Sequence, residues 1–349
     1  MFFLILGEIS IRIFKFIYKC KIYTCDYSLF TFKPYQKSFH TGITKIDSYL
    51  GYDLNKNFKN TINDNVWGWK DVKVSTDKNG LRNQTYNQSK HKVLTVGDSF
   101  AFGDKVSDSE TWQSCLNKNI PSKNFLNGGV FGYGTGQAIM KAEKIYPRIK
   151  PNNLMVQTLV GYNFKRDQMS IKNGFVKPYF SKKSNSEILI IPVKTFNVSN
   201  TKYSKRKSLT FKDHIIVNFT FLNIFHNNYL TNQYKKSKLK FTKSISNMGD
   251  NHASIKDIIE WSAKKSKSLD PNVTWLLQYN ETVPEKTLNE RKLIISILNK
   301  YKIKTIDTYD YLHGDLKPNV SNNKIWFGHH TPFGNQVVCK AIVESGIYN

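Results

Sequence analysis

Short apolar runs alternate with amphipathic stretches in two parts of the chain, Lys92 to Asn163 and Ser254 to Ser345. The runs Val93–Val96 and Leu154–Val160 have the length and composition of buried strands. Between them, "YGTGQAIMKAEKIYPRI" spaces its apolar residues along one face of a helix. Strands that alternate with helices in this way predict an α/β fold with a doubly wound parallel sheet.

The second part continues the alternation. It predicts, in order, a helix in "SIKDIIEWSAKKSKSL", a strand in "VTWLLQYN", a helix entered at Pro284-Glu285, a strand in "IKTID" and a last helix in "GNQVVCKAIVES". In the first part, Ser107 and Glu110 have the spacing of a capping box, which predicts the start of the helix that carries Trp112. A short strand is predicted at Asn124–Leu126.

The pattern divides the chain into three segments. Residues 1–25 form an apolar, basic lead, and residues 26–90 form a β-rich lead-in punctuated by Asn, Asp and Gly turns. Residues 91–349 hold the α/β domain, interrupted at about 164–253 by an insertion rich in Lys, Ser, Asn and aromatic residues. The insertion has too many aromatics for a free linker, so we expect it to pack as a cap or flank.

The charge is strongly positive, with 52 Lys and Arg against 26 Asp and Glu, a formal net charge of +26. Charge alone suggests nucleic acid or an anionic surface as partner. The lysines are spread along the chain, however, and we find no helix-turn-helix, zinc-finger or single-strand-binding motif. We therefore expect no nucleic-acid partner, but a screened attraction to acidic polymers or anionic lipid.

The N-terminal stretch "MFFLILGEISIRIFKFIYKC" is apolar but interrupted by Glu8, Arg12 and Lys15. It is too short for a spanning helix, which needs about 20 mostly apolar residues, and no small-residue cleavage site follows it. Either it is a core or amphipathic surface helix, or it associates with a membrane. We expect membrane association.

The four cysteines do not indicate a metal site. Cys115 and Cys339 lie in apolar helical patterns and are predicted to be core residues. Cys20 and Cys25 do not form a CxxC pair and have no histidines at zinc spacing. We expect neither a metal nor a cofactor.

Small and polar residues follow three of the predicted strands, at the edge where parallel sheets bind ligands. They are Asp98-Ser99, Gly128-Gly129 and Gly161-Tyr162-Asn163, and "FGHHTPFGNQ" precedes the last helix. Each alone has an ordinary explanation as a turn, a cap or a polar loop. Together they describe acyl transfer, which needs a serine, a histidine base and donors for an oxyanion.

The same residues resemble the sequence blocks of the SGNH hydrolases, also called the GDSL esterase/lipase family. Gly97-Asp98-Ser99-Phe100 matches the first block, Gly129 the second, Asn163 the third, and His329 in "HHTPFGN" the last. The resemblance covers the two alternating parts of the chain. It implies a flavodoxin-like sheet of the SGNH-hydrolase type.

The resemblance also implies catalytic roles. Ser99 is the expected nucleophile and His329 the expected base, with Ser99, Gly129 and Asn163 forming the oxyanion hole. Asp98 is expected to fix the turn. The register of the last block favours His329 over the adjacent His330, and neighbouring side chains on an extended stretch point to opposite faces.

The last block departs from the family pattern, which usually has an Asp three residues before the His. Position 326 is Trp here, and position 327, which would apply to the second histidine, is Phe. The alternatives are a carboxylate from the preceding loop, supplied by Asp307, Asp310 or Asp315, and a backbone carbonyl that holds the imidazole instead. The triad carboxylate is thus left open, and a low kcat is expected.

The most favoured function is a serine esterase or an acyltransferase that forms an acyl-serine. "STDKNGLRN" and the insertion resemble bacterial members linked to surface-polysaccharide modification, which implies an acylated carbohydrate or small ester as substrate. One alternative is a weak or inactive relative that binds envelope glycans. Another is a lipase or thioesterase. A cell-envelope or membrane-associated location in a bacterium is expected, with the cytoplasm as the alternative.

Overall fold

Five parallel strands form the central sheet. The computed structural model describes residues 43–64, 69–83, 89–169, 171–172, 175–182, 188–191 and 253–348. The strands are β5 (Lys92–Val96), β6 (Asn124–Asn127), β7 (Asn153–Leu159), β12 (Thr274–Gln278) and β13 (Lys304–Asp307). They lie in the order β13-β12-β7-β5-β6, and every neighbouring pair is parallel. This is the doubly wound, flavodoxin-like order, so the predicted fold class is confirmed.

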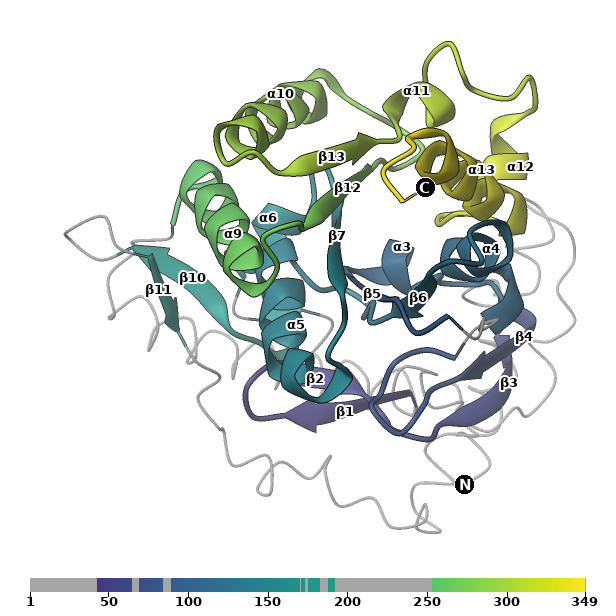
Figure 1. Cartoon of the computed structure of the whole chain (residues 1–349), viewed down its shortest axis with the longest axis horizontal. Coiled ribbons are helices and arrows are strands. Elements are labelled where there is room, and N and C mark those ends of the chain that lie inside the picture. Colours follow the sequence, from purple (N-terminus) through teal and green to yellow (C-terminus); the bar gives the residue numbers. More distant parts are fainter. Residues whose placement is uncertain are drawn as a thin grey trace, which may run out of the picture. The chain divides into compact units, whose positions relative to one another are not determined.

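Helices cover both faces of this sheet (Figure 1). The helices of one face are α5 (Thr135–Ile149), α9 (Ile255–Leu269) and α10 (Glu285–Lys300), and those of the other are α4 (Trp112–Asn119) and α13 (Pro332–Glu344). Alternate strand residues enter two separate apolar clusters, with Leu94 in the first and Val93 in the second. Burial on both faces explains why the strands are apolar runs rather than alternating patterns.

The start of α4 differs from the sequence prediction. Ser107 and Glu110 do form a capping box, but it caps a single 3-10 turn, η2 (Asp108–Glu110). Thr111 then takes an extended conformation and caps α4 itself by accepting the N–H of Ser114. The extended Thr111 separates the two elements, so the capping box lies one turn ahead of the helix.

Two antiparallel hairpins precede the sheet. They consist of β1 (Thr44–Asp47) with β2 (Gly51–Leu54), and β3 (Lys59–Asp64) with β4 (Trp69–Ser75). Their apolar residues belong to the same cluster as α5 and α9. Tyr52 donates its hydroxyl to the carbonyl of Phe131 at 2.7 Å, so the hairpins contact the loop that follows β6.

The described part of the insertion contains the predicted β run. The strands are β8 (Ile171–Lys172), β9 (Phe175–Val176), β10 (Tyr179–Lys182) and β11 (Ile188–Ile191), paired as two small antiparallel sheets. The rest of the insertion lies outside the described residues, as does the lead of residues 1–25, whose membrane association stays a prediction. Within the described ranges, no helix combines the length and apolar character needed to cross a bilayer.

Cys115 and Cys339 both belong to the second apolar cluster, as predicted, and they also form a disulfide, which was not predicted. The bond joins α4 to α13, and 224 positions separate the two cysteines in the sequence. Periodicity could place each cysteine on the inner face of its helix, but only the packing of these two helices brings the sulfurs together.

Candidate active site

Ser99 lies on a sharp turn from strand to helix. β5 ends at Val96, and Ser99 opens the one-turn helix α3 (Ser99–Phe102). Asp98 caps this helix by accepting the N–H of Phe100 at 2.9 Å. The Ser99 N–H, at the first helical position, has no intrahelical acceptor. The turn therefore presents both the hydroxyl and the amide of Ser99 at the carboxyl edge of the sheet.

His329 contacts Ser99, although 230 positions separate the two residues in the sequence. Its Nε2 lies 2.8 Å from the Ser99 Oγ, a hydrogen-bond distance. The histidine precedes α13, whose start is fixed because Thr331 accepts the N–H of Gly334 at 3.1 Å. The Phe100 ring supports the imidazole, with centroids 4.8 Å apart. The serine and the histidine are thus in position for proton transfer.

The neighbouring His330 has a different environment. It is buried and packs against the rings of Trp326 and Phe100, at centroid distances of 4.4 and 5.0 Å. Its ring nitrogens make no hydrogen bonds to the described residues. Burial lowers the pKa of His330 to about 3, so the imidazole stays neutral. Of the two adjacent histidines, it is His329 that meets the serine.

Asn163 begins α6 (Asn163–Asp167), just after β7, and is fully buried. Its Oδ1 accepts a hydrogen bond from Arg166 Nη1 at 3.1 Å. Its Nδ2 has no partner among the described residues. A buried donor without an acceptor is costly, and such groups in native structures commonly serve a function. The amide is therefore available to a ligand oxygen.

Gly129, which is expected to belong to the oxyanion hole, lies in the loop that follows β6. Its N–H donates to Asn127 Oδ1 at 3.0 Å, so it already has a protein acceptor. A Cβ at this position would lie 2.2 Å from the backbone nitrogen of Phe102, so the glycine permits the loop to pack against α3. In the same loop, Gly132 has a φ of 70°, and no acceptor for its N–H is found in the described part of the chain.

Arg166 connects the separate parts of the site, and the sequence analysis did not single it out. Its Nη1 donates to Asp98 Oδ2 at 2.7 Å and to the Tyr133 carbonyl at 3.2 Å, as well as to Asn163. The pKa of Asp98 is raised, because the effect of burial outweighs the opposing effect of the Arg166 charge. In the sequence Arg166 is one of many basic residues, so no local signal marks it.

Asp104 is a second site residue that the sequence blocks do not indicate. Its Oδ2 lies 3.4 Å from the Nδ1 of His329. Burial raises the pKa of Asp104 to about 7. Of the carboxylates considered from sequence, Asp307 is bound to Tyr279 and Arg291, and Asp315 is exposed. Asp104 could have been found only by noticing an acidic residue one short turn beyond the serine.

Nothing in the described ranges suggests a metal centre, since no three His, Cys, Asp or Glu side chains gather there as ligands. The groups that the structure brings together at the site are a serine, a histidine, a carboxylate and a buried amide donor.

No protein-family model and no curated protein matches the sequence. Solved structures with a similar arrangement include LAE5, an alpha/beta hydrolase enzyme from the metagenome of Lake Arreo, which is 10% identical over 75% of this chain and 97% of that chain, with a TM-score of 0.42. A lipase/acylhydrolase from Enterococcus faecalis is 12% identical over 74% of this chain and 95% of that chain, with a TM-score of 0.40. The acetylxylan esterase Axe2 from Geobacillus stearothermophilus, in a catalytic mutant, is 10% identical over 73% of this chain and 94% of that chain, with a TM-score of 0.39. Likenesses this distant carry no argument about activity, so the case for function rests on the site itself.

Proposed function

We propose that the protein is a serine esterase that acts through an acyl-serine. The observation that carries the proposal is the 2.8 Å contact between Ser99 Oγ and His329 Nε2, on a turn at the carboxyl end of a central parallel strand. A nucleophile within hydrogen-bond reach of a base is the arrangement that serine catalysis requires. The Asn163 amide, which has no acceptor among the described residues, adds a donor for the oxyanion.

The proposed reaction has two halves. In the first, His329 takes the hydroxyl proton while Ser99 Oγ attacks the ester carbonyl, and the negative charge gathers on the carbonyl oxygen. Asn163 Nδ2 and the Ser99 N–H donate to that oxygen. When the tetrahedral intermediate collapses, the ester C–O bond breaks, the leaving alcohol takes the proton from His329, and an acyl-serine remains.

In the second half, a water molecule attacks the acyl-serine. His329 removes a proton from the water and returns it to Ser99 Oγ, and the carboxylic acid leaves. The sum is one ester and one water converted into one acid and one alcohol. An acceptor hydroxyl in place of water gives acyl transfer by the same steps.

We propose an acylated carbohydrate or a small ester as the substrate. The resemblance to surface-polysaccharide enzymes supports this class, and so does the exposed aromatic side chain beside each of two site residues. Tyr162, which precedes Asn163, is 37% exposed, and Phe327, two residues before His329, is 60% exposed. Exposed rings offer flat apolar faces to a ligand. A lipase or thioesterase would use the same reacting groups with a different pocket.

A screen of short acyl esters and acetylated glycans tests the proposal. Wild-type protein is expected to release acid or acetate, and Ser99→Ala to reduce turnover to background. If acidic glycans bind, no ester is cleaved and Ser99→Ala changes nothing, the non-enzymatic glycan-binding alternative replaces the esterase.

We also propose a location in the bacterial cell envelope. The disulfide between Cys115 and Cys339 supports this, because disulfides persist in oxidising compartments and are rare in the cytoplasm. The basic, apolar lead of residues 1–25 supports membrane association. Fractionation of cells that express the full chain tests both points, with recovery in the reduced, cytoplasmic fraction as the opposing result.

A further inference from the structure

The turn that follows the nucleophile fixes an acidic residue beside it. Gly103 ends α3 with a φ of 83°, a left-handed conformation that favours glycine. The N–H groups of Gly103 and Asp104 both donate to the Ser99 carbonyl at 3.0 Å. A Cβ on Gly103 would lie 2.8 Å from Thr111 Cγ2 and 3.0 Å from Arg82 Nη1. This turn therefore brings Asp104 back toward Ser99, in a region where the neighbouring side chains pack closely.

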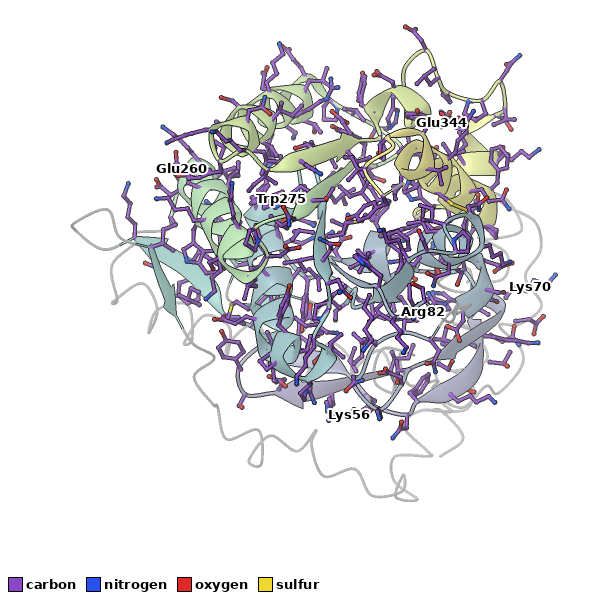
Figure 2. The ribbon with its side chains drawn as sticks, in the orientation of Figure 1. Lys56, Lys70, Arg82, Glu260, Trp275 and Glu344 are labelled. Carbon is purple, nitrogen blue, oxygen red and sulfur yellow. A yellow bond between two sulfur atoms is a disulfide. The ribbon has the colours of Figure 1, made fainter. Side chains whose placement is uncertain are left out.

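A buried arginine from the lead-in holds this turn. Arg82 has no exposed surface, and Figure 2 shows it among the packed interior side chains. Its guanidinium donates to the carbonyls of Phe102, Gly103 and Val106. Its Nε donates to Asp108 Oδ1 at 2.9 Å. Five donors in a fixed plane suit such a task, so the turn has little freedom to move.

The loop that carries the histidine is attached to the same turn. Lys105 Nζ donates to the Phe327 carbonyl at 2.8 Å, and it lies 4.8 Å from the centre of the Phe327 ring. Gly328 follows with a φ of 72° and leads into His329. Asp104 therefore lies beside the imidazole of His329, and Lys105 binds the backbone of the same loop.

We infer that Asp104 is the positioning carboxylate of the site, which orients His329 through Nδ1 in place of the acidic residue that the last sequence block lacks. This inference rests on the proposed esterase function. At 3.4 Å the Asp104–His329 contact is longer than a strong hydrogen bond. Catalytic hydrogen bonds are often long without substrate and tighten in the complex. Trp326 fills the usual acidic position and is buried, so no carboxylate approaches from there.

The charges around Asp104 give the inference a pH signature. Burial raises its pKa to about 7, while Lys105 and Arg82 lower it and Asp98 raises it. His329 faces it directly. Because Asp104 must be ionised to stabilise the imidazolium, activity is expected to rise with pH through a midpoint that belongs to the Asp104–His329 pair. Losing the positive charge at position 105 should move that midpoint upward.

The rate of covalent labelling by a fluorophosphonate, measured from about pH 5 to 9, tests the inference. Asp104→Asn keeps the volume and removes the charge, and it is expected to slow labelling by up to roughly 10⁴-fold, which is the loss in kcat that the same change of the triad carboxylate causes in a serine protease. The matched control is Asp315→Asn, a change at an exposed carboxylate, which should label like wild type. Near-ultraviolet circular dichroism checks that each variant is folded.

A second pair of variants gives a readout that a merely structural role would not change. Lys105→Met should raise the midpoint pH of the labelling rate, and Lys105→Arg, which keeps the charge, should leave it in place. If wild-type protein is labelled and Asp104→Asn is labelled as fast, or if the Lys105 variants share one midpoint, Asp104 does not orient the histidine. If wild-type protein is not labelled at all, the proposed esterase function fails, and the role of Asp104 fails with it.

Discussion

The two polar atoms of the Asn163 side chain differ in their hydrogen bonds to the described residues, and this difference sets the expected role of the side chain. Arg166 occupies Oδ1, so Nδ2 is the group left for a ligand. Asn163→Ala should lower kcat by roughly 10²–10³-fold with little change in KM, because the oxyanion exists only in the transition state. Asn163→Asp should be at least as harmful, since a carboxylate repels the oxyanion. Steady-state kinetics with the best ester measure both constants. Asn299→Ala, a change on the exposed surface of α10, is the control. A kcat near wild type for Asn163→Ala would exclude this asparagine from the oxyanion hole.

Substitutions of the two adjacent histidines, His329 and His330, are expected to have different effects. His329→Ala should abolish turnover, because it removes the only base that contacts Ser99 within the described residues. His330→Phe should remain active, since the buried His330 ring is neutral and its nitrogens bond to nothing described. His330→Ala should instead lower the free energy of unfolding by roughly 1–3 kcal/mol through lost packing. Steady-state kinetics report turnover and urea unfolding reports stability, so the two effects can be separated. A His330→Phe variant that is well folded but inactive would show that the assignment of the base to His329 is wrong.

Single residues also mark the limit of what the sequence could predict. Ser99, His329 and Asn163 were identified because they follow predicted strands or match a block, and the structure brings Ser99 and His329 together. Gly129 was chosen among several glycines of one loop, and only the hydrogen bond to Asn127 distinguishes it. The contacts of Arg166 and Asp104 with the other site residues depend on side-chain directions that no local pattern encodes.

At the scale of elements, the disulfide is the strongest tie between α4 and α13, and α13 directly follows the histidine loop. The closed loop is long, so replacing Cys115 and Cys339 together by Ser should cost roughly 2–5 kcal/mol of unfolding free energy. Thermal unfolding with and without reductant measures this, and the double variant treated in the same way is the control for effects of reductant elsewhere in the chain. Equal melting temperatures for oxidised and reduced wild-type protein would show that the bond contributes nothing.

Most elements of the domain were predicted because their signals are local. The strands β5, β7, β12 and β13 are apolar runs buried on both faces, and the long helices α5, α9 and α10 have one apolar face. The sequence could not predict how Thr111 separates η2 from α4, because a single extended residue leaves the periodicity intact. It also could not predict the pairing of Cys115 with Cys339, which depends on contacts between elements far apart in the chain.

For the whole molecule, the buried acid at the site should make stability depend on pH. The pKa of Asp104 rises from 3.8 to about 7 on folding, so the native state binds more protons than the unfolded state between these values. Its contribution therefore reduces stability as pH rises from about 4 to about 7, by an amount on the order of a few kcal/mol. Asp104→Asn should flatten this dependence and raise the melting temperature at pH 8 relative to wild type. Melting curves for the two proteins across this range should diverge with pH, and parallel curves would contradict the account.

The net charge of +26 is also a property of the whole chain. We expect the full-length protein to sediment with vesicles that contain anionic lipid and to be released as salt screens the attraction. If the apolar lead inserts into the membrane–water interface, deleting residues 1–19 should weaken vesicle binding relative to the full chain at the same salt concentration. Full-length protein that ignores anionic vesicles at physiological salt would remove the membrane role.

The most direct measurement of the central claim is the mass of the protein after treatment with a fluorophosphonate, followed by peptide mapping. We predict a single covalent adduct on Ser99 in wild-type protein, and no adduct in Ser99→Ala or, within the same time, in His329→Ala. Unmodified wild-type protein, under conditions that fully label a control serine esterase, would contradict the account.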